Sequence, residues 1–383
     1  MIRYLLRFNW ALLACAVVLV ALGVVFVGSA GAARSVAALQ NAWRSHAVTA
    51  VAGIAIMFAM AAVDYRKVMG WVAAPCFAIS LVLLVVVLLA GAKIYGGRRW
   101  LWFFQPSEVA KLAVILFMAQ VFGRHGDRLC GFKGFLVALA ILVPPSLLIL
   151  AEPDLGTALV LVPTALAMLL AARIWTKGLV AMILAGLLAA GALLGTVKAA
   201  EAQVDPDARA RIYSYLPLKP HQLARIRTFV NPDADPYGSG WNLRQAKISI
   251  GSGSLAGKGI GKGEAKFLGY LPPSVSMNDF IFAVLAEETG FAGSATVLLL
   301  FLGMFAAGTF TAIRCADDRG RLLVVGVLTL LFSHTYINVA MSIGLMPITG
   351  LPLPFISAGK TFLIVMFAAL GMVQSVAVHG RAE

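Results

Sequence analysis

The sequence predicts an all-α protein that crosses a membrane many times, and three observations support this class. Of its 383 residues, 61% are hydrophobic and only 13% are charged, and the mean hydropathy is +0.90. Soluble domains carry about 25% charged residues, so a soluble core does not accommodate this composition. The apolar residues also gather in stretches of about 20, the length at which a helix spans a bilayer.

Ten apolar stretches are long enough to be predicted as transmembrane helices. They cover residues 10–28, 46–63, 69–91, 106–122, 134–151, 156–172, 178–197, 280–312, 322–343 and 359–378. The eighth is longer than a bilayer requires, so we expect it to tilt, kink or extend beyond the membrane. The first has no clear cleavage site, so we expect it to be retained rather than removed as a signal peptide.

Lys and Arg residues in the short loops predict the orientation of the chain, because cytoplasmic loops carry an excess of them. One set of helix ends carries 13 Lys and Arg, and the opposite short loops carry 5. Both termini are therefore expected in the cytoplasm, and the large loop 198–278, between helices 7 and 8, is expected to be extracytoplasmic. No separate soluble domain is visible, so residues 1–383 are interpreted as one membrane domain.

The 198–278 loop is polar, glycine-rich and basic, with 11 Lys and Arg against 6 Asp and Glu, in a chain of net charge +14. This excess predicts an anionic partner such as a phosphate or a lipid headgroup. Nucleic acid is not expected as a partner outside a cell membrane. Within the loop, residues 198–220 are expected to be irregular, whereas 221–230 and 241–250 are expected to form short helices.

Asp279 stands where this polar loop meets the eighth apolar stretch. A carboxylate at such a boundary faces water while a helix holds its backbone, which suits a general base acting on a lipid-linked substrate. The alternative is structural, because an Asp at the start of a helix is often an N-cap, worth about 1 kcal/mol. The residues alone leave both roles open.

Glu108 and Lys111 lie three residues apart in the fourth stretch, and hence on one face of a helix. Isolated charges inside a bilayer cost at least about 2.5 kcal/mol each, so the two are expected to pair and to face a polar cavity. A purely structural ion pair explains them equally well. Asp154 is interpreted as an N-cap. Glu287 and Glu288 are expected to face the protein interior, where packing or a polar network is favoured over a role in the site.

Residues 251–263 hold six glycines, with Lys258 and Lys262 between them. Neither a Walker motif nor a GxGxxG spacing is present, which disfavours a nucleotide site. The backbone amides and the two lysines suit a phosphate cradle, and a flexible linker is the equal alternative. The histidines and cysteines show no metal-ligand or disulfide pattern, and no Ser/His/Asp set is visible.

Several short strings occur in the order found in one family of membrane proteins. They are Gln105-Pro106-Ser107-Glu108-Val109-Ala110-Lys111, Pro153-Asp154-Leu155-Gly156-Thr157, and residues 99–100, 228–232, 235–241, 245–253, 279–288 and 344–359. Together they resemble the SEDS family (shape, elongation, division and sporulation), whose members polymerise peptidoglycan. The string Gly350-Leu351-Pro352-Leu353-Pro354 is more similar to elongation-type than to division-type members.

The resemblance implies a peptidoglycan glycosyltransferase of the bacterial cytoplasmic (inner) membrane that extends glycan strands from lipid II. The family's essential Asp corresponds to Asp279, and its Glu and Lys in the fourth helix correspond to Glu108 and Lys111. The further positions expected to bind substrate or support the site are Arg99, Trp100, Gln245, Lys247, Lys258, Lys262 and Lys360. The family allows a divalent cation, Mg or Mn, although no metal-ligating residues are predicted.

The resemblance also implies partners and leaves rival functions open. The partners are a class B penicillin-binding transpeptidase and the membrane proteins of an elongation complex. The rivals are a division-type polymerase, a flippase or transporter of the same lipid, and a scaffold whose activity resides in a partner.

This chain departs from the family pattern at two places. The acidic residue and the histidine often found shortly before the catalytic Asp are absent, so they are not obligatory parts of the chemistry here. Lys360 adds a cation at the start of the tenth stretch, where it is expected to meet a pyrophosphate or reach lipid headgroups.

Overall fold

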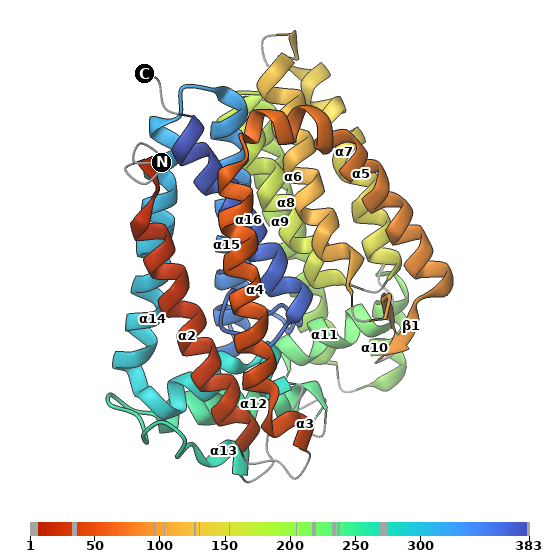
Figure 1. The fold of residues 1–383 in the computed structure, drawn as a ribbon. Coiled ribbons are helices and arrows are strands. Elements are labelled where there is room, and N and C mark those ends of the chain that lie inside the picture. Colours follow the sequence, from red (N-terminus) through yellow and green to blue (C-terminus); the bar gives the residue numbers. More distant parts are fainter. Residues whose placement is uncertain are drawn as a thin grey trace.

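The computed structural model is a bundle of long helices that run between two ends of the molecule (Figure 1). It describes residues 7–32, 37–94, 97–102, 104–125, 128–129, 131–152, 154–203, 205–216, 220–231, 235, 238–267 and 275–380. The start of the first described helix and the end of the last lie at one end of the bundle, which we call the terminal end. The opposite end, which carries the short helices of the large loop, is called the loop end.

Ten long helices correspond one by one to the predicted stretches. They are α2 (Trp10–Ala32), α4 (Ala42–Ala62), α5 (Tyr65–Ala90), α6 (Pro106–His125), α7 (Phe132–Ala151), α8 (Leu155–Ala171), α9 (Thr176–Glu201), α14 (Ile281–Arg314), α15 (Asp318–Ser342) and α16 (Lys360–His379). Among the described residues, nine are long and apolar enough to cross a membrane, and α8 is a shorter apolar helix of 17 residues. The all-α polytopic class is confirmed, and the predicted count of ten spans is compatible with this set.

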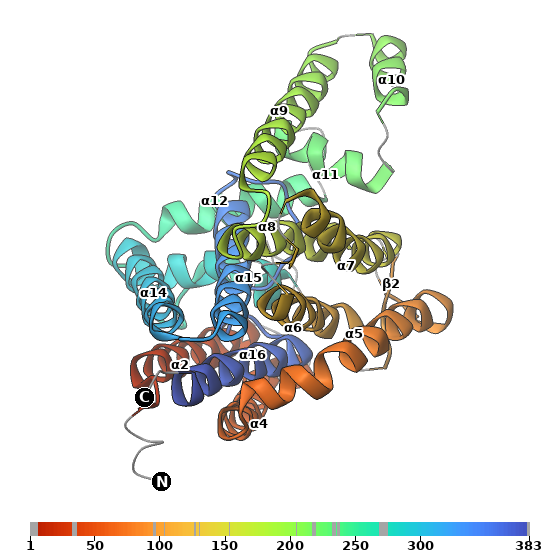
Figure 2. The same ribbon diagram turned by 90° about the horizontal axis from the view of Figure 1, so that it is seen from above.

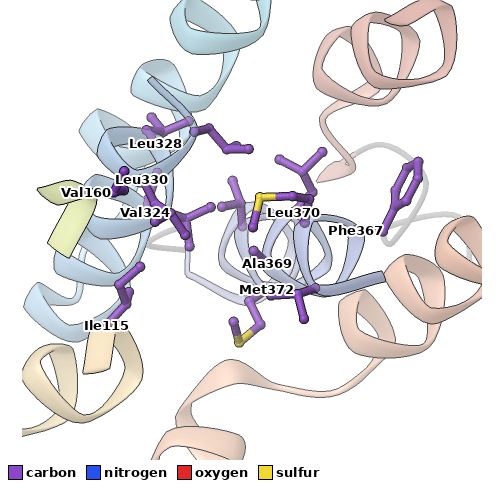
Figure 3. Packing of buried hydrophobic residues seen from close by; sticks show 14 of the residues in the cluster. Ile115, Val160, Val324, Leu328, Leu330, Phe367, Ala369, Leu370 and Met372 are labelled. Carbon is purple, nitrogen blue, oxygen red and sulfur yellow. The ribbon is translucent and has the colours of Figure 1, made fainter. Parts of the chain in front are cut away.

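Helix α16 forms the centre of the bundle, and α9 its periphery (Figure 2). In its apolar stretch 89% of α16 is buried inside the protein, compared with 6% of α9. Figure 3 shows Phe367, Leu370 and Met372 of α16 packed among side chains of the neighbouring helices. Gly53 of α4 lies directly against Phe367, because helices in membranes approach closely where one of them has no side chain.

Short elements cover the loop end. They are α3 (Ala37–Gln40), the antiparallel hairpin β1 (Ala92–Ile94) and β2 (Gly97–Trp100), α10 (Pro206–Ser214), α11 (Pro220–Val230), α12 (Ser239–Ser252), α13 (Glu264–Phe267) and a π-helical turn, Val275–Asp279. The helices expected near 221–230 and 241–250 are confirmed. The prediction that 198–220 is irregular is wrong, because Asp205 caps α10 by accepting a hydrogen bond from the Asp207 backbone.

Helix α14 is broken at Gly290, so of the three outcomes expected for the long eighth stretch (tilt, kink or extension) the structure shows a kink. The backbone of Gly290 has φ 66° and ψ −163°, a conformation that L-residues rarely adopt. A Cβ at this position would also lie 2.6 Å from the Leu255 carbonyl oxygen of the glycine-rich segment. The break separates a buried first piece, which follows Asp279, from the long piece that runs through the bundle.

Candidate active site

The backbone of Asp279 is held by a side chain from a distant helix. Asp279 ends the π-helical turn, and Phe280 then leads into α14. Asn338 of α15, which is fully buried, donates from Nδ2 to the carbonyl oxygens of Asp279 at 2.8 Å and Leu351 at 2.7 Å. Asn338 therefore ties the residue that carries the carboxylate to the loop between α15 and α16.

The capping alternative for Asp279 is wrong. The N-cap of α14 is Phe280, which makes no side-chain cap hydrogen bond. The preceding peptide is held instead by Ser357, whose Oγ donates to the Asn278 carbonyl at 2.7 Å. The loop after α15 thus supports the turn, and the Asp279 carboxylate is not used to begin the helix.

Four charged groups interact electrostatically around this turn, and we call them the Asp279 site: Arg99 of β2, Asp154 before α8, Arg225 of α11, and Asp279. Arg225 Nη1 donates to the Thr349 carbonyl at 3.0 Å. The next residue, Gly350, lies so close to the carboxylate that a Cβ there would be 3.5 Å from Asp279 Oδ2. The loop end therefore brings two cations and two carboxylates together from four separate elements.

The electrostatic surroundings of Asp279 suit a group that exchanges protons. Burial raises the pKa of Asp279 to about 6, with a smaller contribution from Asp154, while Arg225 and Arg99 act in the opposite direction. The carboxyl is therefore ionised at neutral pH, yet it binds a proton more tightly than an exposed Asp does. A general base is most effective when its pKa lies near the working pH.

Asp154 is the predicted N-cap of α8, and this prediction is confirmed. Its Oδ1 accepts from the Thr157 backbone at 3.1 Å, and its Oδ2 accepts from Thr157 Oγ1 at 2.9 Å. Gln105 Nε2, at the start of α6, donates to Oδ2 at 3.3 Å. Arg99 Nε donates to the neighbouring Glu152 carbonyl at 3.2 Å. The starts of α6 and α8 are thereby joined to β2 beside the site.

Glu108 and Lys111 form the expected ion pair, and His334 of α15 completes what we call the Lys111 cluster. Lys111 Nζ lies 3.0 Å from Glu108 Oε1, 2.9 Å from Glu108 Oε2 and 2.9 Å from His334 Nε2. All three side chains are buried, and the Lys111 ammonium lies over the Phe362 ring, 5.5 Å from its centre. The Glu108–Lys111 pair is therefore closed within the bundle, and its role in a substrate site stays a prediction.

The predicted residues of α12 lie near the start of α14 and the loop after α15, whereas Trp100 belongs to β2. Gln245 is buried, and the adjacent Ala246 packs against Phe280 at the start of α14. Lys247 is exposed and lies against Gly344 at the start of the loop after α15. Trp100 is half-buried at the end of β2.

The glycine-rich segment is packed rather than a flexible linker. The backbone of Lys258 donates to the Glu287 carbonyl at 3.0 Å, and its ammonium lies 2.9 Å from Glu287 Oε1 and 3.2 Å from Glu264 Oε2. Glu288 accepts from Lys266 at 2.5 Å. The buried polar network expected for Glu287 and Glu288 is thus confirmed, while a phosphate cradle in this segment stays a prediction.

The two remaining predicted lysines lie elsewhere. Lys262 is exposed at the end of the glycine-rich segment. Lys360, the first residue of α16, lines a separate pocket of about 260 Å³ together with His46 and Thr49 of α4. Their roles in binding substrate stay predictions.

Sequence reasoning missed Arg225, Asn338 and His334. Arg225 belongs to a segment for which only a short helix was expected, and the other two lie inside an apolar stretch with no flanking motif. In the described ranges no group of three or more His, Cys, Asp or Glu side chains is arranged to hold a metal. The described residues therefore do not build a cage for Mg or Mn.

The fold and the site define a multi-pass membrane protein with a charged site, built around one carboxylate, at the loop end of its helices. The chain matches the family model described as cell cycle protein, for FtsW, RodA and SpoVE, over residues 9–382. It belongs to this family, which confirms the resemblance seen in the short strings.

Curated relatives cover most of the chain. It is 35% identical over 335 residues to the peptidoglycan glycosyltransferase MrdB of Escherichia coli (strain K12), covering 86% of this chain and 84% of the relative. It is 37% identical over 307 residues to the probable peptidoglycan glycosyltransferase FtsW of Thioalkalivibrio sulfidiphilus, covering 77% of this chain and 70% of the relative. The glycosyltransferase class predicted from the sequence thus agrees with the family, while both elongation-type and division-type names occur among the relatives.

A solved structure has the same fold. It comes from work on how a peptidoglycan synthase complex coordinates polymerisation and crosslinking, and the two chains superpose with a TM-score of 0.73. They are 26% identical, and the match covers 97% of each.

Proposed function

We propose that this protein is a peptidoglycan glycosyltransferase that polymerises lipid II, with Asp279 as its general base. The names of the relatives support the reaction class. The observation that carries the assignment of the base is the Asp279 carboxylate itself. It is half-buried, has a pKa near 6, stands beside two arginines and rests on a backbone fixed by Asn338.

The proposed reaction is a single displacement at a sugar carbon. The 4-hydroxyl of the acceptor sugar attacks C1 of the lipid-linked N-acetylmuramyl unit, and its proton passes to the Asp279 carboxylate. The bond between C1 and the pyrophosphate oxygen breaks, and undecaprenyl pyrophosphate leaves with the electron pair. General base catalysis of this kind contributes typically 10²–10⁴-fold.

The two arginines of the site supply the positive charge that the leaving group requires. Arg99 was expected in this role, and Arg225 joins it because both act electrostatically on the same carboxylate. Fixed cations next to a developing pyrophosphate stabilise the transition state without reorganisation. Lys111 has the same charge, but it is buried against Glu108 and His334. We therefore assign Lys111 a structural role, in which it holds α6 and α15 together.

The assignment is tested with purified protein and labelled lipid II. Asp279→Asn is expected to lower glycan formation by about 10²–10⁴-fold, because the amide cannot accept the proton. Asp207→Asn, an exposed carboxylate of α10, is the matched control and should polymerise like the unchanged protein.

Three other outcomes would contradict the proposal in different ways. Near-normal polymerisation by Asp279→Asn would remove the general base from this position. Movement of lipid II across vesicles without glycan product would favour the flippase, and a requirement for a partner's active site would favour the scaffold.

We further propose an orientation, a partner and a cellular role. The 13 Lys and Arg at one set of helix ends support cytoplasmic termini, which would place the Asp279 site outside the membrane. The similar structure from a complex that polymerises and crosslinks supports a class B penicillin-binding transpeptidase as partner. The Gly350 to Pro354 string supports elongation, which restoration of rod shape in cells lacking their elongation polymerase would test.

A further inference from the structure

Glu152, the residue that follows α7, is a buried acid that the proposed mechanism does not use. Its side chain is 0% exposed. Neither of its carboxyl oxygens accepts a hydrogen bond in the described structure. A buried carboxylate without donors is strongly disfavoured, whereas the neutral acid loses far less on burial.

The charged groups that face Glu152 come from two elements, Arg99 of β2 and Asp154 before α8. Arg99 Nε donates to the main-chain carbonyl of Glu152, and the carboxyl oxygens receive no hydrogen bond from it. Asp154 accepts three hydrogen bonds, from Thr157 and Gln105. Asp154 in turn interacts electrostatically with three further groups, Glu108, Arg225 and Asp279.

We propose that Glu152 is a positioning residue that must remain a neutral carboxylic acid, so that Arg99 and Arg225 keep their attraction for the pyrophosphate of the substrate. The inference rests on the proposed function. In the Asp279 site two arginines already balance two carboxylates. A further negative charge behind Asp154 would reduce the positive potential at Arg99, so the binding of a pyrophosphate would weaken while the chemistry at Asp279 stayed intact.

The titration of Glu152 supports this assignment. Burial, and to a smaller extent the charge of Asp154, raise the pKa of Glu152 to about 8, while Arg99 acts in the opposite direction. The acid is therefore neutral at pH 7 and ionised at more alkaline pH. Asp279 is ionised throughout this range. Asp279 therefore affects the acid side of the pH profile, and Glu152 the alkaline side.

The first test compares KM for lipid II from about pH 7 to about pH 9.5 in the unchanged protein, Glu152→Gln and the control Asp207→Asn. For the unchanged protein and the control, KM is expected to rise up to about tenfold for each pH unit above the pKa of Glu152. For Glu152→Gln, whose amide is neutral at every pH, KM should stay flat while kcat at pH 7 is retained. An equal alkaline rise of KM in Glu152→Gln would overturn the inference.

A second measurement does not depend on activity, and its signal is assigned to Glu152 by its loss in Glu152→Gln. Infrared difference spectra of the unchanged protein should show the carbonyl band of a protonated carboxylic acid at pH 7 that disappears as the pH rises through about 8. Absence of such a band would overturn the inference. Failure of the unchanged protein to polymerise would instead contradict the proposed function, and the band would still decide the state of Glu152.

Discussion

The Asp279 site and the Lys111 cluster both contain charged side chains, but these side chains pair directly with one another only in the Lys111 cluster. In the Lys111 cluster one ammonium lies within 3.0 Å of both its carboxylate and its imidazole partner, and all three side chains are buried. In the Asp279 site the carboxylate is half-buried, and Arg225 and Arg99 affect it through charge while they donate to backbone carbonyls nearby.

This difference distinguishes a cluster that stabilises the fold from a site that can bind and convert a substrate. A cluster whose charge is already paired inside the protein gains little from a substrate, because binding would first have to separate the pair. A site whose cations are anchored beside a carboxylate keeps a positive potential for an incoming anion. The comparison therefore predicts that changes in the Lys111 cluster act mainly on folding, whereas changes in the Asp279 site act mainly on turnover.

The largest effect on stability is expected from Lys111→Met. The change leaves the Glu108 carboxylate buried without its cation, which should lower the free energy of unfolding by about 3–5 kcal/mol. The double variant Glu108→Gln with Lys111→Met should lose less, because no unpaired charge remains. Denaturation in detergent micelles measures both, with Lys177→Met, an exposed lysine of α9, as the control. Equal losses in the single and double variants would contradict the pairing argument.

Asn338→Ala should affect folding and turnover together, because this side chain lies between the two regions. Two buried carbonyl groups lose their donor, which costs about 1–3 kcal/mol of unfolding free energy for an unsatisfied group. The polymerisation rate per folded molecule should fall by up to about 100-fold, since a shift of about 1 Å at a catalytic group has this effect. A stability loss with an unchanged rate would show that the Asp279 backbone is fixed by other contacts.

Arg225→Gln is expected to act most specifically on the pH dependence of turnover. Arg225 lowers the pKa of Asp279, so its removal should raise that pKa above about 6. Because the base must be ionised, the acid limb of the pH–rate profile should move to higher pH. Activity at a pH below the new pKa should fall by up to about tenfold for each pH unit that the limb moves. The profile of the control Arg211→Gln, an exposed arginine of α10, should not move. An unmoved acid limb in Arg225→Gln would place Arg225 outside the electrostatics of the site.

The helices were predictable because each is an apolar stretch long enough to span a bilayer. A soluble fold does not accommodate so many stretches of this kind. The Glu108–Lys111 pair was predictable for a related reason, since two charges three residues apart inside a membrane must neutralise each other. Helix α10 was missed although Asp205-Pro206 is a visible start signal, an N-cap followed by a proline at the first helical position.

The surroundings of Asp279 were not predictable from local sequence. Arg225 and Asn338 lie 54 residues before and 59 residues after Asp279 in the numbering, on α11 and α15. Their meeting depends on how α11, α15 and the loop near Gly350 pack at the loop end, which no local pattern encodes. The π-helical turn that ends at Asp279 was hidden as well, because an isolated Asp before an apolar run is typical of an N-cap.

The break at Gly290 has a consequence for hydrophobic mismatch. As one straight helix, α14 would be about 51 Å long, well beyond the roughly 30 Å of a hydrocarbon core. The piece after the break, residues 291–314, measures about 36 Å and is exposed along much of its length. The piece before it is packed inside the protein. We therefore expect the tilt of the second piece to absorb local changes in bilayer thickness, while Asp279 keeps its position relative to the arginines around it.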